Sequence, residues 1–290
     1  MRPKPRRVKK IIGKVALYAV MTFLAAVFVF PLFAMIMKSL MTNQQYWSSD
    51  FKVFPETLQW ANYKTVIENS GVNGNGIPYI LVYLFNTLKI CALSTVGLLI
   101  SASFCAYGFT KIQFKGRDLI FAVVLGSTMV PSAVMMIPLY SLYTKFGWID
   151  TSYPMWVGMW FGGGAVNIFL VMQYMRGLPK ELDESAEIDG AGYLRRYFQI
   201  TLPNCKAILA VIAIGAIVGP WNDLQTPLLY LESQDNYTLA LGVSYMRTDN
   251  ILTMPELLAA CVMMTVLPLT AFLFNQKFFV ESVVMSGVKG

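Results

Sequence analysis

The sequence predicts an all-α, polytopic membrane protein with six transmembrane helices and both termini in the cytoplasm. This prediction rests on three observations: the composition, six long apolar runs and the distribution of the basic residues. Of 290 residues, 56% are hydrophobic and only 13% are charged, and the mean hydropathy is +0.54. Soluble domains carry about 25% charged residues. This chain therefore has too few to cover a water-facing surface, which excludes disorder and argues against a soluble enzyme.

A membrane helix needs about 20 consecutive apolar residues. Runs of this kind lie at Val15–Met37, Ile90–Thr110, Leu119–Thr144, Thr151–Met175, Ala207–Leu231 and Leu257–Gln276. Of these, only the fifth contains a charge, Asp223. The first run is too long for the apolar region of a cleaved signal peptide. We therefore expect it to be a retained helix.

The basic residues predict the orientation of these spans. Most of the 23 lysines and arginines lie in the amino terminus, in the loops after the second and fourth runs, and in the tail. Cytoplasmic loops are enriched in lysine and arginine. Both termini are thus expected in the cytoplasm, and the basic amino terminus is expected to contact anionic lipid rather than nucleic acid.

These observations predict five segments. They are a basic cytoplasmic amino terminus (1–14), a first transmembrane helix (15–38), an external loop (39–79), a core of five transmembrane helices (80–280) and a cytoplasmic tail (281–290). The core contains a long cytoplasmic loop, 176–206.

The sequence lacks the residues that several kinds of catalytic and metal site need. There is no histidine, which removes histidine-based catalysis and histidine-ligated metals. The four cysteines show no CxxC spacing and are expected to be small buried side chains. No GxxxxGK[ST] motif is present. We therefore expect no catalytic residue, no metal and no cofactor on this chain.

The loop 176–206 is too long for a simple turn and is expected to form helix–glycine–helix. Acidic residues at Glu181–Asp189 suit a helix amino terminus, and Gly190 suits a helix end. Leu194, Phe198 and Leu202 then share one face, and Pro203 closes the pattern. Periodicity alone also fits an amphipathic helix resting on lipid.

The order of residues in this loop resembles the EAA loop of importer-type ABC permeases. Glu184-Ser185-Ala186 stands for EAA, Gly190 follows the glutamate by six positions, and Ile200–Pro203 matches the I-x-L-P ending. Ser185 is the one departure from EAA, and it is small.

Other segments extend the resemblance. Ala106-Tyr107, Met129–Pro131 and Trp221–Asp223 match motifs of the family's core helices, and the tail is similar to that of the carbohydrate-uptake branch, the group of the smaller maltose-type permease subunit. The departure there is Glu281-Ser282, where a small residue and a glycine are usual.

The resemblance implies a transmembrane subunit of an ATP-driven, binding-protein-dependent sugar importer in a prokaryotic cell membrane. The implied partners are a second homologous permease subunit, an ABC ATPase dimer that uses ATP and Mg, an extracytoplasmic solute-binding protein, membrane lipid and the sugar, with no nucleic acid. It places the contact with the ATPase on Glu184, Ser185, Ala186, Asp189, Gly190, Ala191, Leu194, Phe198 and Pro203, and on Gly287, Lys289 and Gly290 of the tail. In this scheme Glu184 is a polar anchor, Gly190 permits the turn, and Leu194 and Phe198 enter an apolar pocket.

Two interpretations fit the acidic residue inside the fifth run. Asp223, with Trp221, Asn222 and Gln225, suits a sugar pathway, with an aromatic face for the ring and polar groups for the hydroxyls. Alternatively, Asp223 is an internal brace paired with another polar group, as charges inside membranes often are. The glycines 162–164 are expected to permit close helix packing.

Three other functions fit parts of this pattern. An ABC permease for another solute, such as glycerol phosphate or a peptide-like substrate, is the alternative within transport and would share the membrane spans and the EAA-like loop. An ion-coupled carrier would carry several buried acids or histidines, and an intramembrane enzyme would need a metal cluster or a nucleophile–base pair. The sequence shows neither set.

Overall fold

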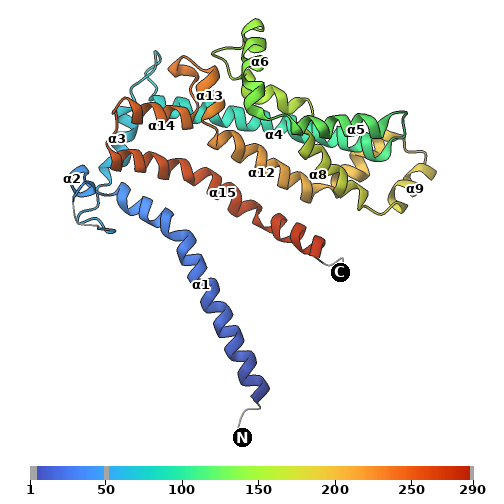
Figure 1. The fold of residues 1–290 in the computed structure, drawn as a ribbon, viewed down its shortest axis with the longest axis horizontal. Coiled ribbons are helices and arrows are strands. Elements are labelled where there is room, and N and C mark those ends of the chain that lie inside the picture. The colour runs from blue at the N-terminus through green and yellow to red at the C-terminus, as the bar shows by residue number, and fades with distance from the viewer. Residues whose placement is uncertain (1–4, 49–51, 288–290) are drawn as a thin grey trace. The chain divides into compact units, whose positions relative to one another are not determined.

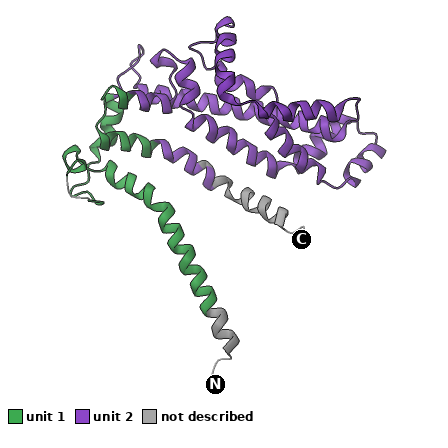
Figure 2. Ribbon diagram, viewed as in Figure 1, with its two compact units in different colours: residues 1–69, 246–263 green, residues 70–245, 264–290 purple. Residues whose placement is uncertain are grey.

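The computed structural model describes residues 5–48 and 52–287, and within these ranges it is built of helices and their connections, with one isolated β-bridge between Val72 and Pro78. Figure 1 shows the course of the chain. The chain divides into two compact units (Figure 2): residues 1–69 with 246–263, and residues 70–245 with 264–290.

Unit 1 contains α1 (Pro5–Ser39), α2 (Asn43–Tyr46) and α3 (Ala61–Asn69). The Asn62 side-chain amide on α3 donates to the carbonyl oxygens of Ser39, at 2.8 Å, and Met41, at 2.9 Å. The first bond satisfies a carbonyl that the end of α1 leaves unpaired, and the second fixes the chain just after the helix. The end of the first apolar helix is thus fixed by the predicted external loop. Parts of α14 (Leu239–Thr248) and α15 (Met254–Gly287) complete the unit.

Unit 2 is organised around α4 (Tyr79–Lys111), which packs against α8 (Ala165–Arg176) and α12 (Lys206–Asn222). Its core is apolar and contains Leu98, Ala102, Ala106, Val171, Met172, Met175 and Ile212. Small residues let the chain approach closely. A Cβ atom at Gly163 would lie 1.9 Å from the Leu98 side chain, which fits the predicted close-packing role. Glycines 162–164 all have positive φ and also interrupt the fourth apolar run.

The third apolar run is bent where its proline removes a helical hydrogen bond. α5 (Arg117–Gly126) and η1 (Ser127–Met129) meet α6 (Ser132–Lys145) at 98° across Pro131. Proline lacks the N–H that would continue the helix. The fifth run is likewise divided, because α12 ends at Asn222 and α13 (Gln225–Tyr230) begins after a break that contains Asp223.

Three helical stretches are long and apolar enough to cross a membrane: Ile12–Ser39, Tyr79–Lys111 and Tyr153–Arg176, the last built from α7 (Tyr153–Trp156), η2 (Val157–Trp160) and α8. Counting each bent pair as one span raises the number to as many as five within the described residues. The sixth predicted run lies within α15.

Candidate functional site

The loop between α8 and α12 has the predicted helix–glycine–helix form. It contains α9 (Glu181–Ile188), α10 (Tyr193–Arg196), the π-helical turn η3 (Tyr197–Thr201) and α11 (Leu202–Asn204). Gly190 has φ +75°, its N–H donates to the Glu187 carbonyl, and the Ala191 N–H donates to the Ala186 carbonyl. This bonding pattern is the Schellman motif, which ends helices at a left-handed residue. The backbone geometry at position 190 therefore strongly favours glycine.

The short helix α9 has two faces of different character. Ala186 is buried, and the Asp183 side chain is only 19% exposed. Glu184, Ser185 and Ile188 are exposed, and the side chain of Glu184 has no hydrogen-bond or ion-pair partner among the described residues. Positions three and four apart share a helix face. The family-motif glutamate therefore faces outward, and its neighbour Asp183 faces into the subunit.

Helix α4 holds this loop on both sides of Gly190. The Lys111 ammonium forms an ion pair with the Asp183 carboxylate, and both side chains are mostly buried. Beyond Gly190, the Tyr107 hydroxyl donates to the Tyr193 carbonyl at 3.0 Å. The hydroxyls of Ser103 and Tyr197 lie 2.7 Å apart in a hydrogen bond. Both helical parts of the loop are thus anchored to one membrane-length helix.

An internal ion pair braces the loop across its turn. The Arg196 guanidinium donates to Glu187 at 2.9 Å and lies over the Tyr193 ring, 4.8 Å from its centroid. From the sequence alone, Lys111 and Arg196 are only two of the basic residues that predict the orientation of the spans. The partner of Lys111 lies 72 positions away, so no local pattern could reveal it.

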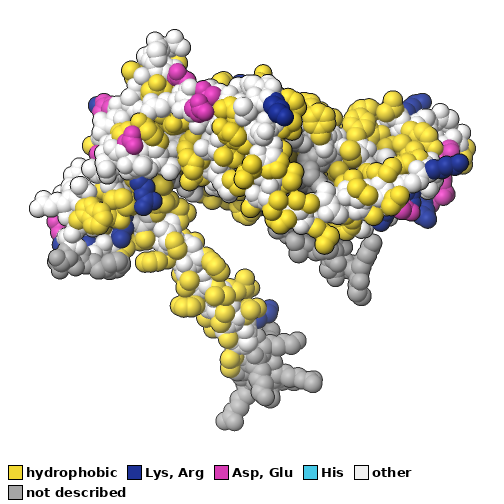
Figure 3. Space-filling model, turned by 45° about the horizontal axis from the view of Figure 1, so that its top comes forward, with side chains coloured by type: hydrophobic (Ala, Val, Ile, Leu, Met, Phe, Trp, Pro, Cys, Tyr) yellow, Lys and Arg dark blue, Asp and Glu magenta, His cyan; other side chains and the backbone are white. Residues whose placement is uncertain are grey.

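The outer surface of the loop is apolar at several points. Ile188 is 88% exposed, Leu194 66% and Phe198 53%. Asp189 and Pro203 are exposed as well, and Ala191 is half-buried. Figure 3 shows charged side chains of both signs gathered at the end of unit 2 that carries α9, with hydrophobic side chains over its middle. Exposed apolar side chains within a charged surface are typical of a contact site. Ile188 was not among the predicted contact residues.

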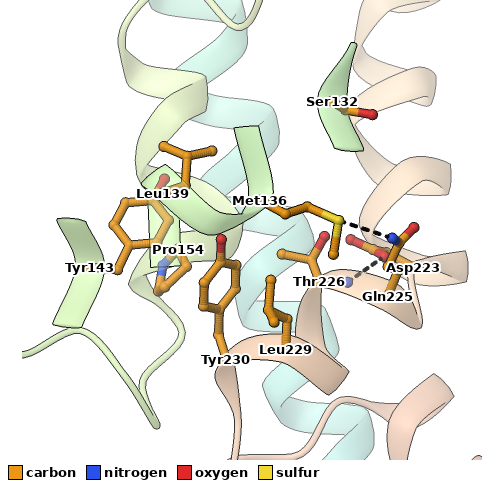
Figure 4. A pocket seen from close by; sticks show the side chains of 10 residues that line it. All are labelled: Ser132, Met136, Leu139, Tyr143, Pro154, Asp223, Gln225, Thr226, Leu229 and Tyr230. Carbon is orange, nitrogen blue, oxygen red and sulfur yellow. Dashed lines mark hydrogen bonds between the residues drawn. The ribbon is translucent and has the colours of Figure 1, made fainter. Parts of the chain in front are cut away.

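A second candidate region lies where α12 ends. A cavity of about 250 Å³ is lined by Ser132, Met136, Leu139, Tyr143, Pro154, Asp223, Gln225, Thr226, Leu229 and Tyr230 (Figure 4). The Asp223 carboxylate accepts a hydrogen bond from the Thr226 N–H at 3.1 Å, which caps the start of α13. Among the described residues it has no basic partner. Its hydrogen bond is thus to the helix that follows it in the chain. Asp223 also lines a neighbouring hollow of about 670 Å³ together with Asn222.

The four residues predicted for a sugar pathway therefore lie in different surroundings. Asp223 and Gln225 line the smaller cavity. Trp221 is only 2% exposed, and its indole N–H donates to the Met264 carbonyl at 3.1 Å. The Asn222 amide donates to the Val218 carbonyl of its own helix. Of the tail residues, Gly287 ends α15, whereas Lys289 and Gly290 lie outside the described residues.

A cluster of hydrogen bonds on Asp150 lies near the other end of α4, and no motif in the sequence points to this residue. Its carboxylate accepts hydrogen bonds from the N–H groups of Glu232, at 3.0 Å, and Ser233, at 2.9 Å, and from the Ser233 hydroxyl. Partial burial opposes ionisation, but these bonds and the Asn236 amide together lower the pKa of Asp150 to about 2. An acceptor-only group thus fixes the loop that follows α13.

Comparison with known proteins agrees with this geometry. The family described as "Binding-protein-dependent transport system inner membrane component" matches residues 97–284. The arabinooligosaccharides transport system permease protein AraQ of Bacillus subtilis is 30% identical over 279 residues, 96% of each chain. The galactooligosaccharides transport system permease protein GanQ of the same organism is 29% identical, over 98% of each chain. The maltose/maltodextrin transport system permease protein MalG of Escherichia coli is 27% identical, over 100% of this chain and 99% of the relative.

The fold also matches a solved structure. A chain of a bacterial ABC transporter involved in the import of the acidic polysaccharide alginate superposes with a TM-score of 0.78 and 19% identity, over 96% of this chain and 100% of that one. The helices, the EAA-like loop and the matched residues lead to one conclusion: this chain belongs to the family of binding-protein-dependent transport system inner membrane components, which are multi-pass proteins of the cytoplasmic membrane.

Proposed function

We propose that this chain is one of two homologous transmembrane subunits of an ATP-driven importer and forms half of the translocation pathway for a sugar or oligosaccharide. An extracytoplasmic solute-binding protein would deliver the sugar. A separate ABC ATPase dimer would bind and hydrolyse ATP with Mg. Support comes from the family and from relatives whose names specify the transport of arabinooligosaccharides, galactooligosaccharides and maltose/maltodextrin.

The observation that carries the proposal is the two-faced helix α9. Its inner face is held by Lys111 of α4, whereas Glu184 and Ile188 point outward without a partner in the described chain. A buried charge is kept only where it is paired, so the inner face belongs to this subunit. The outer face offers one carboxylate beside exposed apolar side chains, which suits a cleft on an ATPase containing an arginine and an apolar floor. The tail around Gly287, Lys289 and Gly290 would add a second contact.

The cavity beside Asp223 is our candidate for the sugar-contacting part of the pathway. It combines a carboxylate, the Gln225 amide and the aromatic rings of Tyr143 and Tyr230. Aromatic faces and polar groups together suit a sugar, whose ring has apolar faces and a hydroxyl-rich edge. Rocking of the helices around this cavity would expose it alternately to either side.

Six membrane crossings with cytoplasmic termini complete the proposal. The three long helices, the two bent pairs and α15 are its candidate spans. Lys115 is exposed in the loop after α4, and Asn73 lies before that helix. A membrane-impermeant thiol reagent on intact cells should label Asn73→Cys and spare Lys115→Cys. The reverse pattern would overturn the orientation.

The function is tested by purifying the complex through a tag on this chain and reconstituting it in liposomes. We expect an ATPase to co-purify. ATP-dependent uptake should then occur with at least one of arabino-, galacto- or maltooligosaccharides, and only when the solute-binding protein is present. Uptake driven by an ion gradient without ATP would contradict the proposal. If the complex takes up glycerol phosphate or a peptide and none of the sugars, the proposal of an ATP-driven importer would stand and the proposal of a sugar substrate would be wrong.

A further inference from the structure

Two neighbouring acids on α9 have different partners. Glu184 faces outward, and Asp183 is paired with Lys111, the last residue of α4. We propose that Lys111 is a positioning residue: its ion pair with Asp183 is the joint through which α9 moves α4 when the ATPase moves α9. The inference rests on the proposed function and adds to it a residue outside the EAA-like motif.

The placement of this ion pair separates it from the other anchors. Among the described residues, it is the side-chain bond that connects α9 with α4. The bonds from Tyr107 and Ser103 reach residues that follow Gly190. Gly190 is a left-handed turn, and a turn of this kind is a place where the two halves of a loop can change their angle. Without the Lys111–Asp183 ion pair, the Glu187–Arg196 ion pair would still hold α9 to the second half of the loop. No side-chain bond among the described residues would then hold α9 to α4, and α9 could change its angle at this turn while α4 stays in place.

The environment gives the ion pair its strength. The Lys111 and Asp183 side chains are 16% and 19% exposed. Charges removed from water attract one another more strongly than surface charges, and an unpaired partner left behind is unfavourable. Lys115 lies four residues further along the chain, in the loop after α4, is exposed and has no ion-pair partner among the described residues. Lys115 is therefore a matched control, because it carries the same charge as Lys111 but forms no ion pair with α9.

Helix α4 is suited to carry the motion across the membrane. It is 33 residues long, and at 1.5 Å per residue it spans about 50 Å. Near its other end, the Asn86 amide donates to the carbonyls of Asp235 and Tyr237, and the Thr87 hydroxyl accepts from the Leu239 N–H. One continuous helix thus bonds the ATPase-facing loop at one end and the loop 235–239 at the other.

The test uses the purified, reconstituted complex and measures ATP hydrolysis and oligosaccharide uptake on the same preparation. The variants are Lys111→Met, Asp183→Asn, the charge swap Lys111→Asp with Asp183→Lys, and the control Lys115→Met. We expect each single variant to hydrolyse ATP within about twofold of the unchanged complex while sugar imported per ATP falls about tenfold. The swap should recover most of that ratio, and Lys115→Met should not change it.

Other outcomes would overturn the inference. Single variants that import as much sugar per ATP as the unchanged complex would show that the ion pair transmits nothing. A swap no better than the single variants would show that pairing is not what matters. Single variants from which the ATPase no longer co-purifies would assign the ion pair to assembly rather than to coupling. Failure of the proposed function itself is distinguishable, because the unchanged complex would then show no ATP-dependent uptake.

Discussion

The two ends of α4 hold their loops with different chemistry. At the Lys111 end, the Lys111–Asp183 ion pair and the Ser103–Tyr197 hydrogen bond join side chain to side chain, beside one bond from the Tyr107 hydroxyl to a backbone carbonyl. At the other end, the Asn86 amide donates to backbone carbonyls of the loop 235–239. A bond to the backbone fixes the path of a loop whatever its side chains are, whereas a bond between side chains needs both residues. The attachment at the Lys111 end therefore depends on the identity of both side chains, whereas the attachment at the Asn86 end fixes the backbone path of the loop.

The same contrast appears in the two acidic residues that organise loops. Asp183 faces a lysine, so its role depends on charge. Asp150 faces backbone N–H groups and a hydroxyl, so its role depends on accepting hydrogen bonds. Substitutions at the two ends should accordingly have different effects. At the Lys111 end we expect a loss of coupling between ATP hydrolysis and transport, and at the Asn86 end a loss of stability.

The largest effect should come from Gly190→Val at the Lys111 end. With φ +75°, a β-branched side chain there costs about 1–3 kcal/mol locally and displaces α9 from its Schellman turn. We expect ATP hydrolysis to persist while sugar uptake is lost. Gly192→Ala is the matched control, since Gly192 has φ −67° and nothing within 4 Å of an added Cβ atom. Equal uptake by both variants would remove the turn from the coupling mechanism.

A smaller effect is expected from Asp150→Ala at the Asn86 end. The variant loses several hydrogen bonds and places alanine at φ +56°, which should lower the stability of the complex by about 2 kcal/mol. Thermal denaturation in detergent measures this. Asp235→Ala is the control, because the loop uses the backbone carbonyl of that residue. Unchanged melting of Asp150→Ala would show that this cluster of hydrogen bonds adds nothing.

The same residue predicts a pH dependence. Its folded-state pKa, about 2, lies below the ordinary 3.8. The carboxylate therefore contributes stability above about pH 4, and the contribution disappears as the pH falls toward 2. Because the carboxylate is only partly buried and solvent screens its interactions, we expect a contribution of only about 1 kcal/mol. The difference in melting temperature between the unchanged complex and Asp150→Ala should narrow across this window. A constant difference would contradict the assignment.

The smallest effect on stability is expected from Asp223→Asn, in the break between α12 and α13. Asparagine still accepts the Thr226 N–H bond and is a good cap, so stability should change by less than about 1 kcal/mol. A brace with a basic partner would instead cost about 3–5 kcal/mol when its charge is removed. Expression of the complex separates these interpretations. A stable variant with weaker apparent sugar affinity would place Asp223 on the pathway, and a stable variant with normal affinity would leave it a helix cap.

Sequence alone predicted the helical class, the membrane setting and the helix–glycine–helix loop, because apolar runs and the positions of Gly190 and Pro203 are local signals. It did not predict what anchors that loop, because Lys111 and Asp183 are distant in sequence. It also missed Asp150, whose partners are backbone groups that no side-chain pattern reveals. Trp221 looked suited to a sugar, yet it is buried and bonded to a carbonyl. Residue type alone cannot say which way a side chain in a membrane helix faces.

The central claim is that the outward face of α9 docks on a partner ATPase while its inward face is held by α4. It is tested most directly with a photo-crosslinking amino acid at Ile188, which is 88% exposed, and a second at the exposed Lys115 as control. In the purified complex, illumination should join position 188 to the co-purifying ATPase and should leave position 115 unjoined. An intact complex in which position 188 forms no adduct with the ATPase would contradict the account.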